Sequence, residues 1–459
     1  MAIFTARQLH LIAVLFALGT FLSGCSFQLQ NNSDSGDLDV QLPMPVQRND
    51  EGETTSQAYE YQIVKLLNVF EIKKVRGEYA RFYLNPTTTE EKRLTGVFPT
   101  ADFLKNKKNI YTPTSDLSVQ MASIYFHMQN LAMLDRKMGV GDVNHWPRDI
   151  GLSVKIPTVS ETGDLRLMEN NAIYDGAYDA ILLVPNRSEQ LPIAVNGGIL
   201  AHEHFHSLFF KIVTRKLIAE KKISPEQSAG IHDHKKLRKF FPLLEDTSSD
   251  LKSGDGNQVR EEEIQENYDI VLLDALNEGL ADFWGWLYTN DVNFIIHSLP
   301  GVNQGRSLKL SKIELENLTL PTREKILTTL RGFAQKSDSF RDSVNGYAYD
   351  LGTQFARHLK AFVSLHQNQQ KISLGQSKEK IAKAVVDFLP KLSNEFVVKS
   401  KGQMLAPHDL ALKLIEGIEN LTTSECESVI AVFNREKTDG SMYKCENLDG
   451  KVKIKLSFS

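Results

Sequence analysis

The chain has 459 residues, with 53 lysines and arginines against 57 aspartates and glutamates, so its formal net charge is −4. Charges of both signs are spread along the chain, which excludes the concentrated basic surface of a nucleic-acid-binding protein. A chain of this length is expected to fold into two or three lobes. The sequence contains no phosphate-binding loop, nucleotide-binding fingerprint or internal repeat.

The N-terminus has the pattern of an export signal. Arg7 precedes an apolar run from Leu9 to Leu22 that is short for a membrane-spanning helix. The run ends in Leu22-Ser23-Gly24-Cys25, which resembles a bacterial lipobox. The resemblance implies that residues 1–24 are removed, that Cys25 carries a lipid anchor, and that the protein is held at the bacterial cell envelope. In a host with two membranes, Ser26 after the cysteine implies sorting to the outer membrane by the same resemblance. An uncleaved N-terminal anchor is the alternative.

The polar residues 25–58 contain few aromatic side chains, so we predict a flexible tether there. Residues 59–296 are predicted to form an α+β lobe. Its clearest strand is Ala180–Val184, and a helix is expected near residues 115–138.

The most informative motif is His202-Glu203-His204-Phe205-His206, which has the form H-E-x-x-H. On an α-helix His202 and His206 lie one turn apart on the same face, so both imidazoles can reach one zinc ion. Glu203 could take a proton from a zinc-bound water. His204 projects about 200° away from His202, which predicts a polar core residue rather than a ligand. The alternative is an exposed helix with solvated histidines, but the apolar residues around the motif favour burial.

A third ligand is predicted downstream, where Glu278 and Asp282 share one face of an apolar helical segment. One carboxylate could bind the metal while the other accepts a hydrogen bond from a ligating histidine. The alternative, a solvated acidic face, fits poorly with the neighbouring Phe283 and Trp284.

H-E-x-x-H followed by N-E-x-x-x-D resembles the gluzincin metallopeptidases, which include thermolysin-like and fungalysin-like enzymes. The resemblance implies a two-lobed fold in which His202, His206 and Glu278 bind Zn²⁺. Glu203 is then the general base, and Asp282 lies beside one of the residues that bind the metal. It also implies that the Asn171 side chain and the Ala172 backbone, on an edge strand, hold a peptide substrate.

The interval between His206 and Glu278 is several times longer than in thermolysin-like enzymes, and residues 221–268 supply most of the excess. Their composition predicts a solvated insertion. His232 and His234 could bind metal there, but the polar composition of a solvated loop explains their presence more simply.

The donor that would stabilise the transition state is predicted in Tyr347-Ala348-Tyr349-Asp350-Leu351-Gly352, which we expect to open a helix. Tyr-x-x-Gly at such a position is similar to the aminopeptidase-like gluzincins, in which the tyrosine donates to the oxyanion. Tyr349 is the candidate and Tyr347 is second to it. Core packing of Tyr349 is the alternative.

Residues 297–459 are predicted to form a mainly helical C-terminal lobe, because apolar residues recur at helical spacing. The predicted elements are helices over Arg323–Ala334, Tyr347–His366, Lys378–Leu389, His408–Leu421 and Cys426–Phe433, and a closing strand over Lys451–Phe458. Cys426 and Cys445 form an even pair that an oxidising compartment could join in a disulfide, with two free thiols as the alternative.

The sequence therefore predicts an envelope-anchored zinc metallopeptidase that acts on peptides or proteins by Glu203-assisted attack of a zinc-bound water. The alternative function is a non-catalytic envelope binding lipoprotein that retains a gluzincin fold. Hydrolysis of a bond outside ordinary peptides also stays open, because a fold and a metal site do not define the substrate.

Overall fold

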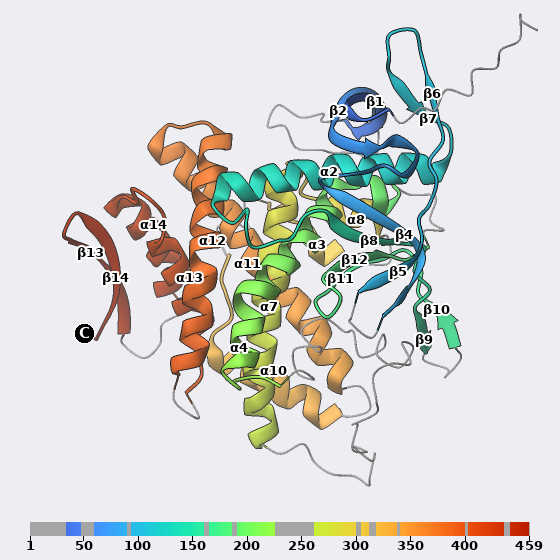
Figure 1. Cartoon of the computed structure of the whole chain (residues 1–459). Helices are drawn as coiled ribbons and strands as arrows, with labels where there is room; N and C mark the ends of the chain where they lie inside the picture. The colour runs from blue at the N-terminus through green and yellow to red at the C-terminus, as the bar shows by residue number, and fades with distance from the viewer. Residues whose placement is uncertain are drawn as a thin grey trace, which may run out of the picture.

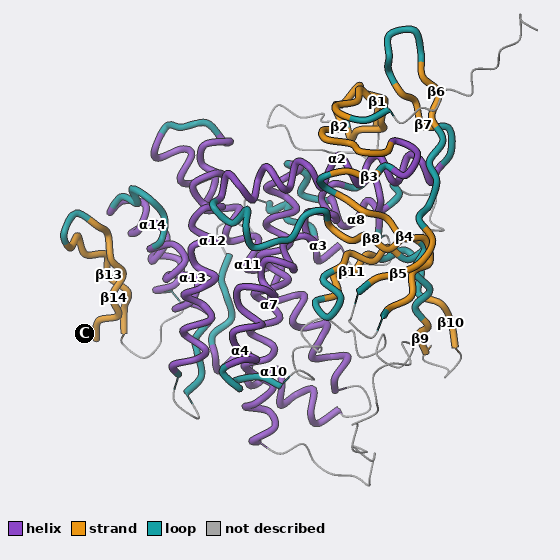
Figure 2. Tube along the Cα trace, viewed as in Figure 1, coloured by secondary structure: helices purple, strands orange, loops and turns teal. Residues whose placement is uncertain are grey.

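The computed structural model describes residues 34–46, 59–89, 93–159, 165–185, 191–224, 261–299, 304–311, 318–336, 340–399, 403–435 and 441–458. The predicted α+β class is confirmed. Strands of two mixed sheets occupy the N-terminal part, and the C-terminal part is mostly helical (Figures 1 and 2). Cys25, His232 and His234 lie outside the described residues.

The first sheet has five strands in the order β3-β2-β1-β7-β6. Strand β1 pairs antiparallel with β2 and parallel with β7. The bounds are β1 Gly36–Pro45, β2 Tyr59–Glu71, β3 Arg76–Gly77, β6 Phe103–Lys105 and β7 Tyr111–Pro113.

The second sheet has the order β11-β12-β8-β4-β5, in which β8 runs parallel to both β4 and β12. Its strands are β4 Ala80–Thr88, β5 Leu94–Val97, β8 Arg148–Leu152, β11 Ala172–Asp175 and β12 Ala180–Leu183. Strand β11 lies at the edge of this sheet. A small hairpin of β9 Pro157–Val159 and β10 Leu165–Leu167 extends nearby.

The helices pack into one large core with the sheets. Helix α2 is central to it: it contacts β1, β2 and β4 and also packs on α3. Ser115 caps the start of α2, where its hydroxyl accepts a hydrogen bond from the Ser118 N–H (3.2 Å), and Gly139 ends the helix at a φ of 80°. The helices are α2 Asp116–Met138, α3 Gly197–Phe209, α4 Arg215–Ala219, α7 Glu261–Thr289, α8 Phe294–Ser298, α10 Arg323–Lys336, α11 Phe340–Gln370, α12 Leu374–Val398, α13 Pro407–Glu416 and α14 Thr423–Asn434.

Part of the expected tether is instead strand β1. Leu38, Val40 and Leu42 alternate along this strand and are buried in the main core. An alternating pattern buries one face of a strand even where the surrounding composition is polar. The prediction of a tether over residues 25–58 is therefore wrong for residues 36–45.

Several further boundaries differ from the sequence prediction: α12 ends at Val398 rather than Leu389, and α13 ends at Glu416 rather than Leu421. Helix α7 already begins at Glu261, inside the predicted insertion 221–268, of which residues 225–260 lie outside the described part. Helix α11 begins at Phe340 rather than at Tyr347, so Tyr349 lies within a helix and not at its start.

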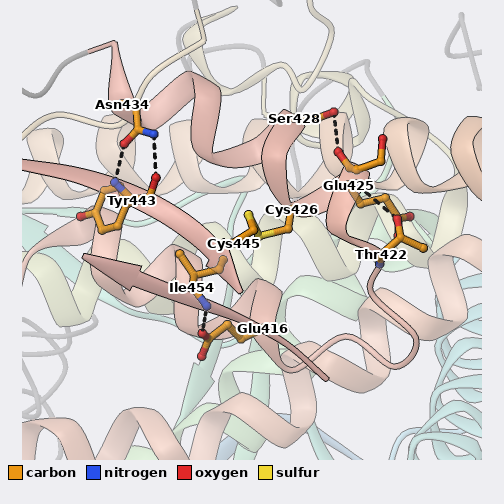
Figure 3. The surroundings of a disulfide bond; sticks show 10 residues. Glu416, Thr422, Glu425, Cys426, Ser428, Asn434, Tyr443, Cys445 and Ile454 are labelled. Carbon is orange, nitrogen blue, oxygen red and sulfur yellow. Dashed lines mark hydrogen bonds between the residues drawn. A yellow bond between two sulfur atoms is a disulfide. The ribbon is translucent and has the colours of Figure 1, made fainter. Parts of the chain in front are cut away.

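The C-terminal hairpin, β13 Ser441–Leu448 and β14 Lys451–Phe458, is joined to α14 by a disulfide between Cys426 and Cys445. The two Cα atoms are 6.1 Å apart. Figure 3 shows a second link: Asn434 accepts from the Tyr443 N–H (2.7 Å) and donates to its carbonyl oxygen (3.0 Å). These links attach the hairpin to the helical part.

Among the described helices, none has the length and apolar character needed to cross a membrane.

Candidate metal centre

The histidine motif lies on α3, all of whose residues are buried. Asn196 caps the helix, because its side-chain oxygen accepts hydrogen bonds from the N–H groups of Gly198 (3.1 Å) and Ile199 (3.3 Å). His202, Glu203 and His206 form a buried group that could hold a metal ion. The alternative of an exposed helix with solvated histidines is therefore wrong.

The side chains of His202, His206 and Glu278 converge on one point. Nε2 of His202 lies 2.9 Å from Nε2 of His206. The carboxylate of Glu278, on α7, lies 3.5 Å from the first nitrogen and 3.7 Å from the second. Ligand atoms around a tetrahedral zinc ion, at about 2.0–2.1 Å from it, are separated by roughly 3.3 Å. The three side chains thus have nearly the spacing of ligands around one ion.

The other ring nitrogen of each histidine meets an acceptor on α7. Nδ1 of His206 lies 3.0 Å from the side-chain oxygen of Asn277, and Nδ1 of His202 lies 2.9 Å from Oδ1 of Asp282. The hydrogen bond to Asn277 favours a proton on Nδ1 of His206 and leaves the lone pair of that ring on Nε2, whereas His202 and Asp282 are in ion-pair contact. The two Nε2 atoms and a carboxylate therefore face one buried point, an arrangement that a bound cation would stabilise.

The same carboxylates create a demand for positive charge at this point. Burial by itself would lower the pKa of His202, but the neighbouring Asp282 and Glu278 raise it to about 10. A bound metal cation would satisfy this demand, and two imidazoles with a carboxylate are a donor set that zinc accepts.

Glu203 also lies within 4.8 Å of the two histidines, but its carboxylate is held by the sheet rather than by α7. Its Oε2 accepts a hydrogen bond from the backbone N–H of Tyr174 (2.7 Å), on edge strand β11. Burial raises the pKa of Glu203 to about 7. The spacing of Glu278 fits a third ligand better, and Glu203 remains a neighbouring carboxylate tied to β11.

His204 points away from this group, as the helical periodicity predicts. Its Nε2 lies 3.0 Å from each carboxylate oxygen of Asp135 on α2. Both side chains are fully buried. The pair joins α3 to α2 on the side of the helix that faces away from the candidate ligands.

The cavity beside these residues has a volume of about 250 Å³, and Tyr349 of α11 is part of its wall together with His202, Glu203, His206 and Glu278. The nearby Tyr347 instead packs against Phe333 of α10, with ring centroids 6.0 Å apart. The negative charge of Glu278, and then burial, hold the pKa of Tyr349 well above its usual value. Its hydroxyl therefore stays protonated and can donate a hydrogen bond.

A glycine brings Tyr349 to this position. A Cβ on Gly352 would lie 2.7 Å from the carbonyl oxygen of Ala275 and 3.1 Å from Cβ of Glu278. Helices α7 and α11 can approach this closely only where a side chain is lacking. Gly352 lies three residues after Tyr349, so the Tyr-x-x-Gly spacing places the tyrosine at the point where the two helices cross.

Asn171 and Ala172 line the same cavity at the start of edge strand β11. The side-chain oxygen of Asn171 accepts a hydrogen bond from the N–H of Ala172 (3.0 Å). The structure thus brings both predicted substrate-binding residues to the cavity that contains the histidines.

Arg306 is a site residue that the sequence analysis missed. Its guanidinium lies 2.6 Å from Oδ1 of Asp282, 3.2 Å from Oε2 of Glu278 and 4.8 Å from the ring centre of Tyr349. Arg306 ends a short 3₁₀ turn, Gln304–Arg306, and no local pattern singles it out. Asn277 was also missed, although its position directly before Glu278 in the N-E-x-x-x-D motif was a usable signal.

No protein-family model matches the chain. Neither a curated protein nor a solved structure matches it.

Proposed function

We propose that the protein is a zinc-dependent hydrolase, a metallopeptidase of the gluzincin type that cleaves peptide bonds. The observation that carries the proposal is the convergence of the two Nε2 atoms and the Glu278 carboxylate on one buried point beside Glu203. Zinc held there would supply Lewis-acid chemistry, which polarises a carbonyl oxygen and lowers the pKa of a water molecule.

Glu203 would act as the general base that takes the proton from the attacking water. The Tyr174 N–H holds Oε2 of Glu203 and so fixes the direction of the carboxylate. A general base must be held within hydrogen-bonding reach of the proton that it removes. Its place next to His202 on α3, within the cavity wall, supports this role.

Strand β11 would align the substrate. The N–H of Tyr174 points to Glu203 rather than to β12, and Ala172, two residues earlier, directs its backbone groups to the same side. An extended peptide can add to such an edge through main-chain hydrogen bonds. Asn171 would orient the peptide at the start of the strand.

Tyr349 would donate a hydrogen bond to the oxygen of the scissile carbonyl as negative charge develops on it. Arg306 would hold Glu278 and Asp282 in position through its two ion pairs. The positive charge of Arg306 also compensates the negative charges of these two buried carboxylates.

The test compares two Glu→Gln variants. Wild type, loaded with zinc, should bind one zinc per chain and cleave an unselected peptide library. Glu203→Gln should keep the zinc and lose hydrolysis by roughly 10²–10⁴-fold, the usual contribution of a general base. Glu220→Gln, at an exposed residue after α4, is the matched control and should retain full activity.

Two results would contradict the proposal. Turnover retained by Glu203→Gln would remove the general-base role. Less than one zinc per chain in zinc-loaded wild type would favour a non-catalytic binding protein.

We further propose that the enzyme is lipid-anchored at the bacterial cell envelope, preferentially at the outer membrane. The support is the segment Leu22-Ser23-Gly24-Cys25, together with one disulfide of the kind that forms in oxidising compartments. Growth with a clickable fatty acid should label wild type and leave Cys25→Ser unlabelled. Equal labelling of the two proteins would refute lipid attachment at Cys25.

A further inference from the structure

The sheet β3-β2-β1-β7-β6 has one face that packs on the core and one that does not. Leu38, Val40 and Leu42 of β1 are buried in the main core, on the side where α2 contacts β1 and β2. Side chains alternate along a strand, so the residues between these three point to the opposite side. Figure 1 shows β1 and β2 at the top of the molecule, above α2. The side of the sheet that points away from the core is called the open face below.

Strand β2 presents three large apolar side chains on the open face. Ile63 pairs directly with Gln41 of β1, which lies between two core-facing residues and therefore points outward. Tyr61 and Tyr59 precede Ile63 by two and four residues on the same strand, so they share its side. The three side chains are between 50% and 59% exposed. Contiguous apolar side chains on a surface indicate an interaction site.

Strand β6 adds a fourth apolar side chain to the open face. The Thr112 hydroxyl of β7 donates a hydrogen bond to the side chain of Gln41 (3.4 Å), which places Thr112 on the open face. Leu104 of β6 pairs with Thr112 and therefore points the same way. It is 68% exposed. Ile63 and Leu104 thus lie at the two ends of one row that crosses β2, β1, β7 and β6.

The chain that precedes this sheet indicates what the open face meets. Cys25, the predicted lipidation site, is nine residues before Asp34, and nine residues of chain span at most about 32 Å. The carboxylate of Asp34 is fixed against β6 and β7, because it forms an ion pair with Lys105 (3.1 Å) and accepts a hydrogen bond from the Tyr111 hydroxyl. Lys105 directly follows Leu104. A lipid on Cys25 would therefore keep the Leu104 end of the open face close to a bilayer.

We propose that the open face of this sheet lies on the bilayer surface, with Tyr59, Tyr61, Ile63 and Leu104 in the interfacial zone. A tyrosine ring is apolar while its hydroxyl stays hydrated, so tyrosine suits the boundary between water and acyl chains. Ile63 and Leu104 gain free energy by leaving water. The inference rests on the proposed envelope location but not on the proposed hydrolase activity.

The first test removes the lipid, so that the face must bind by itself. The chain from residue 25, the product that the lipobox implies, carries Cys25→Ser and is mixed with vesicles of phosphatidylethanolamine and phosphatidylglycerol. It should float with the vesicles in a density gradient. The triple variant Tyr59→Ser, Tyr61→Ser, Ile63→Ser should partition more weakly by roughly tenfold or more, because burial of even one such side chain contributes about that much.

The matched control removes three exposed apolar side chains from the C-terminal part of the chain. Val398→Ser, Met442→Ser and Leu448→Ser, combined in one variant, should float as the parent does, since these residues are 74%, 48% and 42% exposed but lie outside the sheet. Equal flotation of the two triple variants would overturn the proposal.

The second test reads the position of single residues in a protein held by its N-terminus. A hexahistidine tag before residue 25 replaces the lipid and binds nickel-chelating lipids in the vesicles. Cys426 and Cys445 are joined in a disulfide, so Cys25→Ser leaves no free thiol, and Ile63→Cys introduces a single labelling site for the fluorophore NBD. NBD at this position should brighten when vesicles are added and be quenched by brominated lipids. NBD at Val398→Cys should do neither.

Two outcomes of the second test would overturn the proposal. NBD at position 63 that stays as dim as NBD at position 398 on vesicles would show that the open face does not touch the bilayer. Brightening with protein concentration in the absence of vesicles would assign the face to a second copy of the chain. Because the tag replaces the lipid, neither outcome depends on lipidation of Cys25, which fatty-acid labelling tests separately.

Discussion

Gly279 and Gly352 meet where α7 crosses α11, so closely that a Cβ on Gly279 would lie 2.3 Å from the carbonyl oxygen of Gly352. Glu278 lies next to the first glycine and Tyr349 one helical turn before the second. The contact between two backbones therefore determines where a candidate ligand and a candidate donor lie relative to each other.

Gly352→Ala should destabilise the protein by about 1–3 kcal/mol, because its methyl group would be forced against the backbone of α7. Gly346→Ala, on the same helix, is the matched control. Nothing lies within 4 Å of a Cβ at Gly346, so this change should stabilise the protein by about 0.4–1 kcal/mol. Chemical unfolding of both variants measures the difference, and equal stabilities would show that the crossing is not as tight as described.

Tyr349→Phe should lower kcat by about 10²–10³-fold with little change in KM, because the hydroxyl is needed only as charge develops in the transition state. Tyr347→Phe should leave both constants unchanged, since Tyr347 packs against Phe333 outside the cavity wall. Steady-state kinetics on a peptide substrate provides the measurement. An active Tyr349→Phe would assign that tyrosine to packing instead.

His204→Ala should cost about 3–5 kcal/mol in the free energy of unfolding, because it leaves the fully buried carboxylate of Asp135 with only the long hydrogen bond from Asn144 (3.4 Å). The variant should nevertheless bind one zinc per chain, whereas His206→Ala should lose the metal. Unfolding curves and metal analysis are compared for the two proteins. Loss of zinc from a folded His204→Ala would mean that His204 is needed to hold the ligands in place.

Arg306→Met should destabilise the metal-free protein more than the zinc-loaded protein. Without the guanidinium, the buried carboxylates of Glu278 and Asp282 repel each other, at a cost of about 3–5 kcal/mol. A zinc ion bound at the histidines would offset part of this cost, and binding to the native state stabilises it by mass action. Thermal unfolding with zinc and with a chelator tests this, and an equal loss of Tm under both conditions would contradict it.

Local patterns were sufficient for the helical elements and for the pair of histidines. The spacing of His202 and His206 places both on one helix face whatever surrounds them, since helical periodicity is a property of the backbone. The same periodicity predicted the helices of the C-terminal part to within a few residues at most ends. Three ends differ more: α11 begins at Phe340 rather than Tyr347, α12 continues through Pro390 to Val398 rather than ending at Leu389, and α13 ends at Glu416 rather than Leu421. Nothing in Phe340 to Gly346 stands out as an apolar stripe.

Composition alone misled in one region. The polar residues around it suggested that Leu38, Val40 and Leu42 belong to a tether, yet their alternation forms a buried strand. The mean composition of a polar segment does not reveal a strand in which apolar residues recur at every second position.

The sequence by itself determined that two histidines and a glutamate share one helix, and the apolar segment around Glu278 and Asp282 indicated the third ligand before the family resemblance supported it. Only the tertiary structure decided that Asn277 and Asp282 face the Nδ1 atoms, that Asp135 holds His204, and that Arg306 joins the two carboxylates. These contacts connect residues that are far apart along the chain. Such contacts depend on how closely helices pack, as at Gly279 and Gly352, and packing distance is not encoded in any local repeat.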